Sequence, residues 1–78
     1  MRKRATPDIR ERFGFALKSR REVLGLTQEE FAERAGIHRT YLSDVERGTR
    51  NISLLNIERV AFALSIPVSK LFQLVERH

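Results

Sequence analysis

The alternation of hydrophobic and polar positions between residues 26 and 48 predicts two short amphipathic helices joined by a tight corner. Thr27 is followed three residues later by Glu30, which is the spacing of a capping box, so the first helix is expected over residues 28–35. Gly36 comes directly after this helix and can adopt the left-handed conformation that ends it. The segment therefore has the pattern of a helix, a short turn and a second helix.

The second helix is predicted over residues 39–47, and Gly48 ends it. Leu42 and Val45 fall together at about 100° per residue, on the face expected to meet a small core. The opposite face is polar and lacks the Glu and Lys pattern of a merely solvated helix. Its members are Arg39, Thr40, Ser43, Asp44 and Arg47. Such a face on the second helix of this arrangement suits the major groove of DNA.

Three further helices complete the prediction, and no segment has the pattern of a strand. They are expected over residues 7–24, 54–64 and 70–76. Their expected N-caps are Thr6, Ser53 and Ser69, with Pro7 in the favoured first helical position. The fold class is therefore all-α, one five-helix domain over residues 7–78. A basic, flexible arm at residues 1–6 precedes it and is either a disordered tail or a further DNA contact.

The composition favours an anionic partner and offers no catalytic chemistry. The 78 residues carry 15 Lys and Arg against 10 Asp and Glu, which leaves a net charge of +5 and a pI near 10.7. A basic balance is typical of nucleic-acid-binding proteins, but many other small domains share it. Without cysteine there are no disulfides and no thiolate metal sites. His38 and His78 are the only histidines, and neither has the neighbours of a catalytic site.

No apolar run reaches the ~18 residues that a membrane span needs, and the basic N-terminus lacks the apolar stretch of a signal peptide. We therefore expect a cytoplasmic, nucleoid-associated protein that binds no membrane and no cofactor.

Residues 13–72 resemble the helix-turn-helix domain of phage repressors and Cro proteins. The resemblance is carried by FG, GLTQEEFAERAGIHRTYLSDVERGTRNIS and ALSIPVSKLF. Within this stretch, the segment RTYLSDVERGTRN closely resembles the controller proteins of restriction–modification systems. The resemblance implies a compact, lambda-repressor-like domain of five helices. It also implies binding to operator DNA as a two-fold dimer, repression or activation of transcription, and no catalysis.

The resemblance also implies roles for single residues. Arg39 and Thr40 match first-turn positions that reach base edges, and an arginine can donate two parallel hydrogen bonds to guanine. The implied base-reading residues are Arg39, Thr40, Ser43 and Asp44. Asp44 is alternatively placed to orient Arg39 or Arg47. The expected phosphate contacts are Gln28, Tyr41, Arg47, Thr49, Arg50, Asn51 and Lys18, and Tyr41 is alternatively a half-buried aromatic.

Four other positions matter for the structure of the domain. Arg21 and Glu46 match a family pair that joins the first helix to the recognition helix by a partly buried ion pair. Gln28 matches a glutamine that braces the recognition helix while it contacts a phosphate. Ser65 replaces the glycine that usually ends the fourth helix, which costs up to about 1 kcal/mol if the backbone there is left-handed.

The fourth helix carries more apolar residues than one core needs. Its expected core face is Ile57, Val60, Ala61 and Leu64. Other apolar side chains fall on the opposite side, where an exposed stripe indicates an interface. The predicted dimer interface is Leu55, Arg59, Phe62 and Ile66, with help from Leu74 and Val75 of the last helix. The alternative is that Phe62 and Ile66 pack beneath the last helix.

The sequence thus predicts a homodimeric, sequence-specific transcription regulator of the restriction–modification controller kind. Its candidate partners are double-stranded operator DNA, a second copy of the chain and RNA polymerase. A prophage repressor or an antitoxin that regulates its own operon is the alternative within this class. A protein-interaction module that has lost DNA binding is the alternative from another class, and the presence of Gln28, Arg39 and Arg50 argues against it. An enzyme is not expected.

Overall fold

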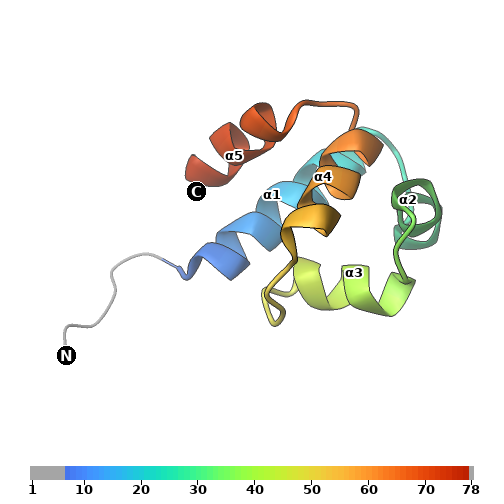
Figure 1. Ribbon diagram of the computed structural model, residues 1–78, viewed down its shortest axis with the longest axis horizontal. Coiled ribbons are helices and arrows are strands. Elements are labelled where there is room, and N and C mark those ends of the chain that lie inside the picture. The colour runs from blue at the N-terminus through green and yellow to red at the C-terminus, as the bar shows by residue number, and fades with distance from the viewer. Residues whose placement is uncertain (1–6, 78) are drawn as a thin grey trace.

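Five α-helices and no strand make up residues 7–77, the part of the chain that the computed structural model describes. The helices are α1 (Ile9–Val23), α2 (Gln28–Ala35), α3 (Arg39–Glu46), α4 (Leu54–Ala63) and α5 (Val68–Glu76). In Figure 1, α3 forms the lower edge of the domain, α2 stands beside it, and α5 lies at the opposite edge. This confirms the all-α, five-helix prediction. The predicted arm at residues 1–6 lies outside the described residues.

Most helix ends lie where the capping residues predict them. Thr27 Oγ1 accepts a hydrogen bond from Glu30 N at 3.1 Å, and Glu30 Oε1 accepts one from Thr27 N at 2.9 Å, so the capping box of α2 is complete. Ser53 caps α4 by accepting from the backbone N–H three residues on. Gly36 and Gly48 both take the left-handed backbone conformation, with φ of 72° and 76°.

The start of α1 differs from the prediction, because Asp8 rather than Thr6 is its N-cap. The Asp8 carboxylate accepts from Arg10 N at 2.7 Å, and the Glu11 side chain accepts from Asp8 N at 3.1 Å. These bonds satisfy N–H groups of the first turn, so α1 begins at Ile9. Pro7 consequently precedes the cap instead of filling the first helical position.

The start of α5, after the turn that follows α4, also differs from the prediction. Ser65 has a φ of 60°, so its backbone lies in the left-handed region that favours glycine. Pro67, with extended backbone angles, is the N-cap of α5, so the predicted cap Ser69 is wrong and lies inside the first turn. The proline itself contributes no side-chain bond to the cap, which leaves the start of α5 without that stabilisation.

Every helix contributes at least one fully buried side chain to a single core. These side chains include Leu17, Phe31, Leu42, Val60 and Leu71. Phe13 and Phe72 extend the core between α1 and α5, with ring centroids 5.9 Å apart. The predicted core positions in α3 and α4 are buried, except that Ile57 is only partly buried. Burying one such large side chain contributes about 1.5–3 kcal/mol, so the core is the main source of stability.

Candidate nucleic-acid interface

The inner side of α3 rests on α1 at a point where no side chain fits. A Cβ built on Gly14 would lie 2.5 Å from the carbonyl oxygen of Glu46 and would also clash with that of Val45. Gly14 therefore lets the last turn of α3 approach the α1 backbone directly. Leu42 and Val45 are buried on the same side of α3. The position of α3 is thus set by backbone contact as well as by apolar packing.

A buried ion pair joins the same two helices. Arg21 Nε donates to Glu46 Oε2 at 2.7 Å and Arg21 Nη2 donates to Glu46 Oε1 at 3.0 Å. The two side chains are only 9% and 3% exposed, and Arg21 Nη1 also donates to the carbonyl of Leu26 at 2.7 Å. Hydrogen bonding to Glu46 raises the pKa of Arg21, so its guanidinium stays charged although it is buried.

Gln28, the first residue of α2, donates from Nε2 to Glu46 Oε1 at 2.9 Å. The predicted ion pair between Arg21 and Glu46 is therefore formed. Through Arg21 and Gln28, Glu46 holds both α1 and α2 to α3.

The outward side of α3 begins with two exposed side chains, Arg39 and Thr40. Neither makes a hydrogen bond or ion pair to another residue within the described range 7–77. His38, immediately before them, is the N-cap residue but makes no side-chain cap bond. The first turn of α3 therefore presents a guanidinium and a hydroxyl with free hydrogen-bonding capacity.

The second turn is organised around Asp44. Its carboxylate accepts hydrogen bonds from Arg47 and, at 3.3 Å, from Arg50 Nη2. Arg47 Nη1 also donates to Ser43 Oγ at 2.6 Å. Thr49 donates from its backbone N and from Oγ1 to the carbonyl of Asp44, at 3.0 and 3.1 Å. Asp44 thus orients Arg47, as one interpretation of the sequence expects, and it also holds Arg50, which the sequence did not indicate.

Tyr41 lies at the border of this face and is half-buried, as one of its two interpretations expects. The guanidinium carbon of Arg50 lies 4.9 Å from the centre of its ring, a cation–π arrangement. Its hydroxyl accepts a hydrogen bond from Ser53 N at 3.4 Å. Two other predicted phosphate contacts, Asn51 and Lys18, are exposed but make no bond to the rest of this group in the described structure.

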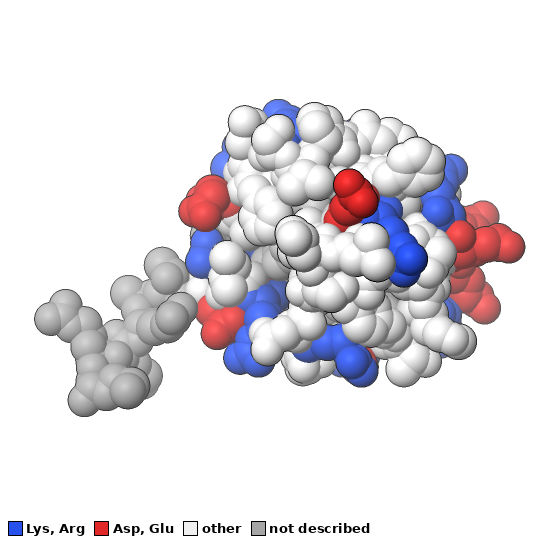
Figure 2. Space-filling view, viewed as in Figure 1, with Lys and Arg blue, Asp and Glu red and all other residues white. Residues whose placement is uncertain are grey.

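The charge distribution agrees with this placement of the outward face. Figure 2 shows basic side chains along the lower edge that α3 forms, and acidic ones gathered at the side where α2 lies. The exposed acids of α2 include Glu29, Glu30 and Glu33. An anionic partner is therefore attracted to the α3 edge of the molecule.

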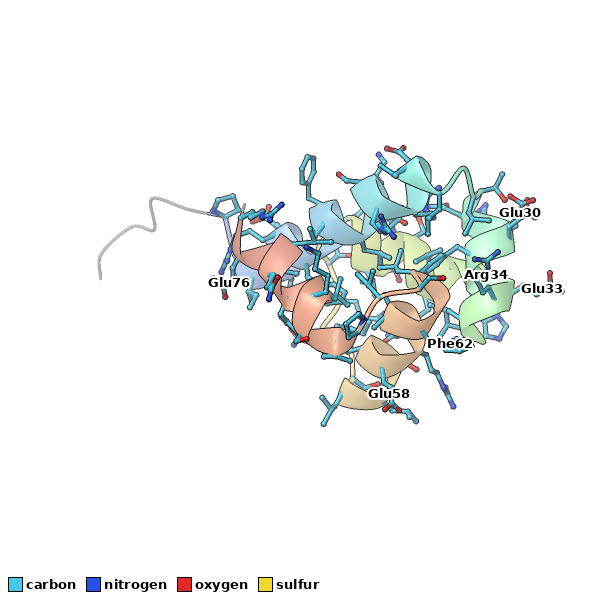
Figure 3. The ribbon with its side chains drawn as sticks, turned by 90° about the horizontal axis from the view of Figure 1, so that it is seen from above. Glu30, Glu33, Arg34, Glu58, Phe62 and Glu76 are labelled. Atoms are coloured by element: carbon cyan, nitrogen blue, oxygen red, sulfur yellow. The ribbon has the colours of Figure 1, made fainter. Side chains whose placement is uncertain are left out.

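A second surface of interest lies on α4. Leu55 and Phe62, both predicted for a dimer interface, are 56% and 76% exposed, and Leu54 is exposed beside them. Figure 3 shows Phe62 on the side of α4 that is turned away from α5. The alternative in which Phe62 packs beneath the last helix is therefore wrong. Arg59 is also exposed, and its Nη1 donates to Asn56 Oδ1 at 3.2 Å.

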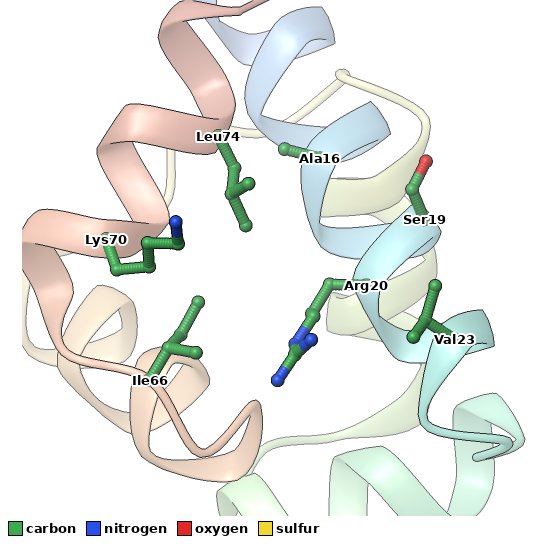
Figure 4. A pocket seen from close by; sticks show the side chains of 7 residues that line it. All are labelled: Ala16, Ser19, Arg20, Val23, Ile66, Lys70 and Leu74. Atoms are coloured by element: carbon green, nitrogen blue, oxygen red, sulfur yellow. The ribbon is translucent and has the colours of Figure 1, made fainter.

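The contribution predicted for α5 needs correction. Val75 is fully buried in the core and cannot take part in an interface. The reason is that α5 packs on α1 with the face that carries Leu71 and Val75 turned inward. Leu74 and Ile66 are half-buried and line a groove of about 320 Å³ between α1 and α5 (Figure 4). Only their exposed parts remain available to a partner.

Residues 17–71 match the helix-turn-helix family, and the chain belongs to this family. One relative is the control protein C.MunI of a Mycoplasma species, which is 45% identical over 71 residues, 90% of this chain and 96% of that protein. The control protein C.BamHI of Bacillus amyloliquefaciens is 45% identical over 62 residues, 78% of this chain and 76% of its own length. No helix among the described residues is both long and apolar enough to cross a membrane.

Solved structures of controller proteins share the fold. The restriction–modification controller C.AhdI from Aeromonas hydrophila superposes with a TM-score of 0.79 at 44% identity, covering 81% of this chain and 96% of its own. The controller C.Esp1396I, solved as a tetramer in complex with its natural 35 base-pair operator, superposes with a TM-score of 0.84 at 26% identity, covering 92% and 95%. The similarity to restriction–modification controllers thus holds in both sequence and structure.

Proposed function

We propose that this protein is a sequence-specific DNA-binding transcription regulator of the restriction–modification controller kind, which binds operator DNA as a homodimer. The observation that supports this most directly is the outward face of α3, where Arg39 and Thr40 are exposed and unpaired in the described structure. The opposite side of α3 is held by Gly14 and by the Arg21–Glu46 pair. A face that is fixed before binding loses little conformational entropy when it meets DNA.

The proposal assigns two different roles, base reading and phosphate binding, to two groups of residues. Base edges in the major groove are read by Arg39, Thr40, Ser43 and Asp44. Phosphates are contacted by Gln28, Tyr41, Arg47, Thr49, Arg50, Asn51 and Lys18. Phosphate contacts set the position of the protein on the duplex and carry most of the affinity, whereas base contacts decide which sequence is bound. A guanine is the expected partner of Arg39, because its O6 and N7 accept the two parallel bonds of a guanidinium.

The proposed dimer uses the exposed apolar side chains of α4. One domain covers only about half a turn of DNA, so two linked copies are needed to read both half-sites. Leu55 and Phe62 form the centre of the proposed seam, and Arg59, Ile66 and Leu74 contribute at its border. Burying a Phe and a Leu supplies about 3–6 kcal/mol per subunit before the cost of association.

A footprint on the DNA upstream of the protein's own gene tests the proposal. We expect protection of two related half-sites, with affinity falling roughly 10²–10⁴-fold between about 50 and 200 mM salt because several phosphates are neutralised. A nearly flat salt response without protection would instead support a protein-interaction module. A neighbouring restriction-enzyme gene would favour a controller over a prophage repressor or an antitoxin.

RNA polymerase is the further partner that this proposal names, and the protein is expected to act in the cytoplasm on the nucleoid. Transcription with purified polymerase, with and without the protein, tests this part separately. A change in transcript level that requires the operator supports it.

A further inference from the structure

Asp44 is the acidic side chain that α3 directs toward its outward face. Its Oδ1 accepts a hydrogen bond from Arg47 Nη2, and its Oδ2 accepts one from Arg50 Nη2 at 3.3 Å. The side chain of Asp44 is 23% exposed, whereas those of Arg47 and Arg50 are 59% and 48% exposed. Two solvent-facing cations are thus held by one carboxylate that lies behind them. We refer to these three residues as the Asp44 clamp.

Neighbouring contacts hold the clamp in place. Ser43 Oγ accepts from Arg47 Nη1 at 2.6 Å, and the ring of Tyr41 lies against the guanidinium of Arg50. The backbone of Asp44 is tied to the following loop by the two hydrogen bonds from Thr49. The arginines can therefore bind phosphates only by leaving the carboxylate or by sharing their donors with it.

We propose that Asp44 is a specificity-determining residue that competes, as an internal counterion, with DNA phosphates for Arg47 and Arg50. This inference rests on the proposed function, because it concerns the same DNA-binding face. On any duplex, an arginine that turns to a phosphate leaves Asp44 with fewer donors and close to a polyanion. The carboxylate and the phosphates carry like charges and repel each other, so Asp44 weakens binding to DNA in general.

An operator can offset this loss, whereas most other sequences cannot. Cytosine N4 and adenine N6 present donor hydrogens in the major groove, and a carboxylate accepts them. Where such an amino group lies opposite Asp44, the carboxylate exchanges arginine donors for a base donor. Elsewhere it stays short of partners beside the phosphates, which is unfavourable. A repulsive element that acts mainly on wrong sequences increases selectivity.

The test compares Asp44→Asn with the parent on two duplexes of equal length, one carrying the footprinted operator and one of random sequence. We expect the affinity for random DNA to rise about tenfold and the operator affinity to change by less than about threefold, so selectivity falls. The salt dependence on random DNA should steepen by about 0.9 for each arginine that gains a phosphate. Thermal unfolding followed by circular dichroism verifies that the variant folds, and Asp44→Ser serves as a second variant.

Two controls isolate the clamp from general electrostatics. Glu33→Gln makes the same change in net charge at an exposed position of α2, which contributes no residue to the clamp, and should leave the ratio of operator to random affinity unchanged. In a background that carries both Arg47→Ala and Arg50→Ala, Asp44→Asn should raise the affinity for random DNA clearly less than it does in the parent, because only the repulsion between the carboxylate and the phosphates remains to be removed. The difference between the two effects measures the coupling between the carboxylate and its two arginines.

Each outcome is decisive. Unchanged selectivity in Asp44→Asn, with a parent that binds its operator selectively, overturns the inference and leaves the proposed function standing. A loss of operator affinity alone would make Asp44 only a direct base reader and also overturns it. A parent that binds no DNA selectively refutes the proposed function itself, so the two failures are distinguishable.

Discussion

Removing Arg21 alone should destabilise the domain far more than an exposed ion pair would. The Glu46 carboxylate is 3% exposed in the parent, and in Arg21→Met it would keep, among residues 7–77, only the side-chain hydrogen bond from Gln28. A buried charge that loses its counterion in this way costs about 3–5 kcal/mol. In a domain of 60–100 residues, 1 kcal/mol shifts the thermal midpoint by about 4–8 °C, so we expect a fall of at least about 12 °C.

Urea unfolding followed by circular dichroism measures this free energy directly. The matched control is the double variant Arg21→Met with Glu46→Leu, in which no charge remains buried and the apolar volume is retained. We expect this double variant to recover at least half of the loss, because replacing a buried ion pair with apolar residues is often neutral. A single variant within about 1 kcal/mol of the parent would refute the reasoning, since it would mean that water reaches the pair freely.

Four other predictions concern base reading, assembly, one turn and one cap. Arg39→Ala should weaken operator binding by about 1–3 kcal/mol and relax base preference at one position per half-site, whereas Arg50→Ala should weaken all sequences alike; selection from random DNA compares them. Phe62→Glu should sediment as a folded monomer, and a well-folded dimer would place the seam elsewhere. Ser65→Gly should raise the free energy of unfolding by up to about 1 kcal/mol in urea, because its φ of 60° suits glycine. The hydrogen bond from the backbone N–H of Thr27 lowers the pKa of Glu30 below 4.5. The stabilisation that the Glu30 carboxylate gives to the fold is therefore complete above pH 4.5 and is lost as pH falls through the lowered pKa. The difference in the free energy of unfolding between the parent and Glu30→Ala should shrink over the same pH range.

The start of a helix was predictable where the sequence offers only one suitable N-cap residue. Thr27 with Glu30 and Ser53 with a free N–H three residues on leave little choice of cap, and both predictions are confirmed. The predicted N-caps of α1 and α5 were wrong, and near both helix starts the sequence offers more than one candidate residue. Asp8 displaced an upstream threonine because its carboxylate is the stronger acceptor for the first N–H groups, and Pro67 displaced a downstream serine as N-cap.

The outward face was predictable from helical periodicity, but its internal pairing was not. The spacing of Asp44 and Arg47 at three residues indicates a pair on one helix face, and it forms. Arg50 reaches the same carboxylate only after the chain has turned at Gly48, which local spacing does not reveal. Val75 was misplaced for a related reason, since one residue along α5 rotates a side chain by about 100° from the border into the core.

The two sides of α3 are therefore constrained by different physics. A changed side chain on the inner side meets the backbone of Gly14 or the buried Arg21–Glu46 pair, and it costs folding free energy. Arg39 and Thr40 meet only solvent in the free protein and face DNA in the proposed complex, so a changed side chain there is expected to alter DNA contacts at little cost in stability. Sequence preference can consequently diverge among proteins of this fold while the helix keeps its position. Asp44 is the exception under the same proposal, because its carboxylate is already bonded to Arg47 and Arg50 in the free protein, so its change is expected to alter both the free protein and the complex.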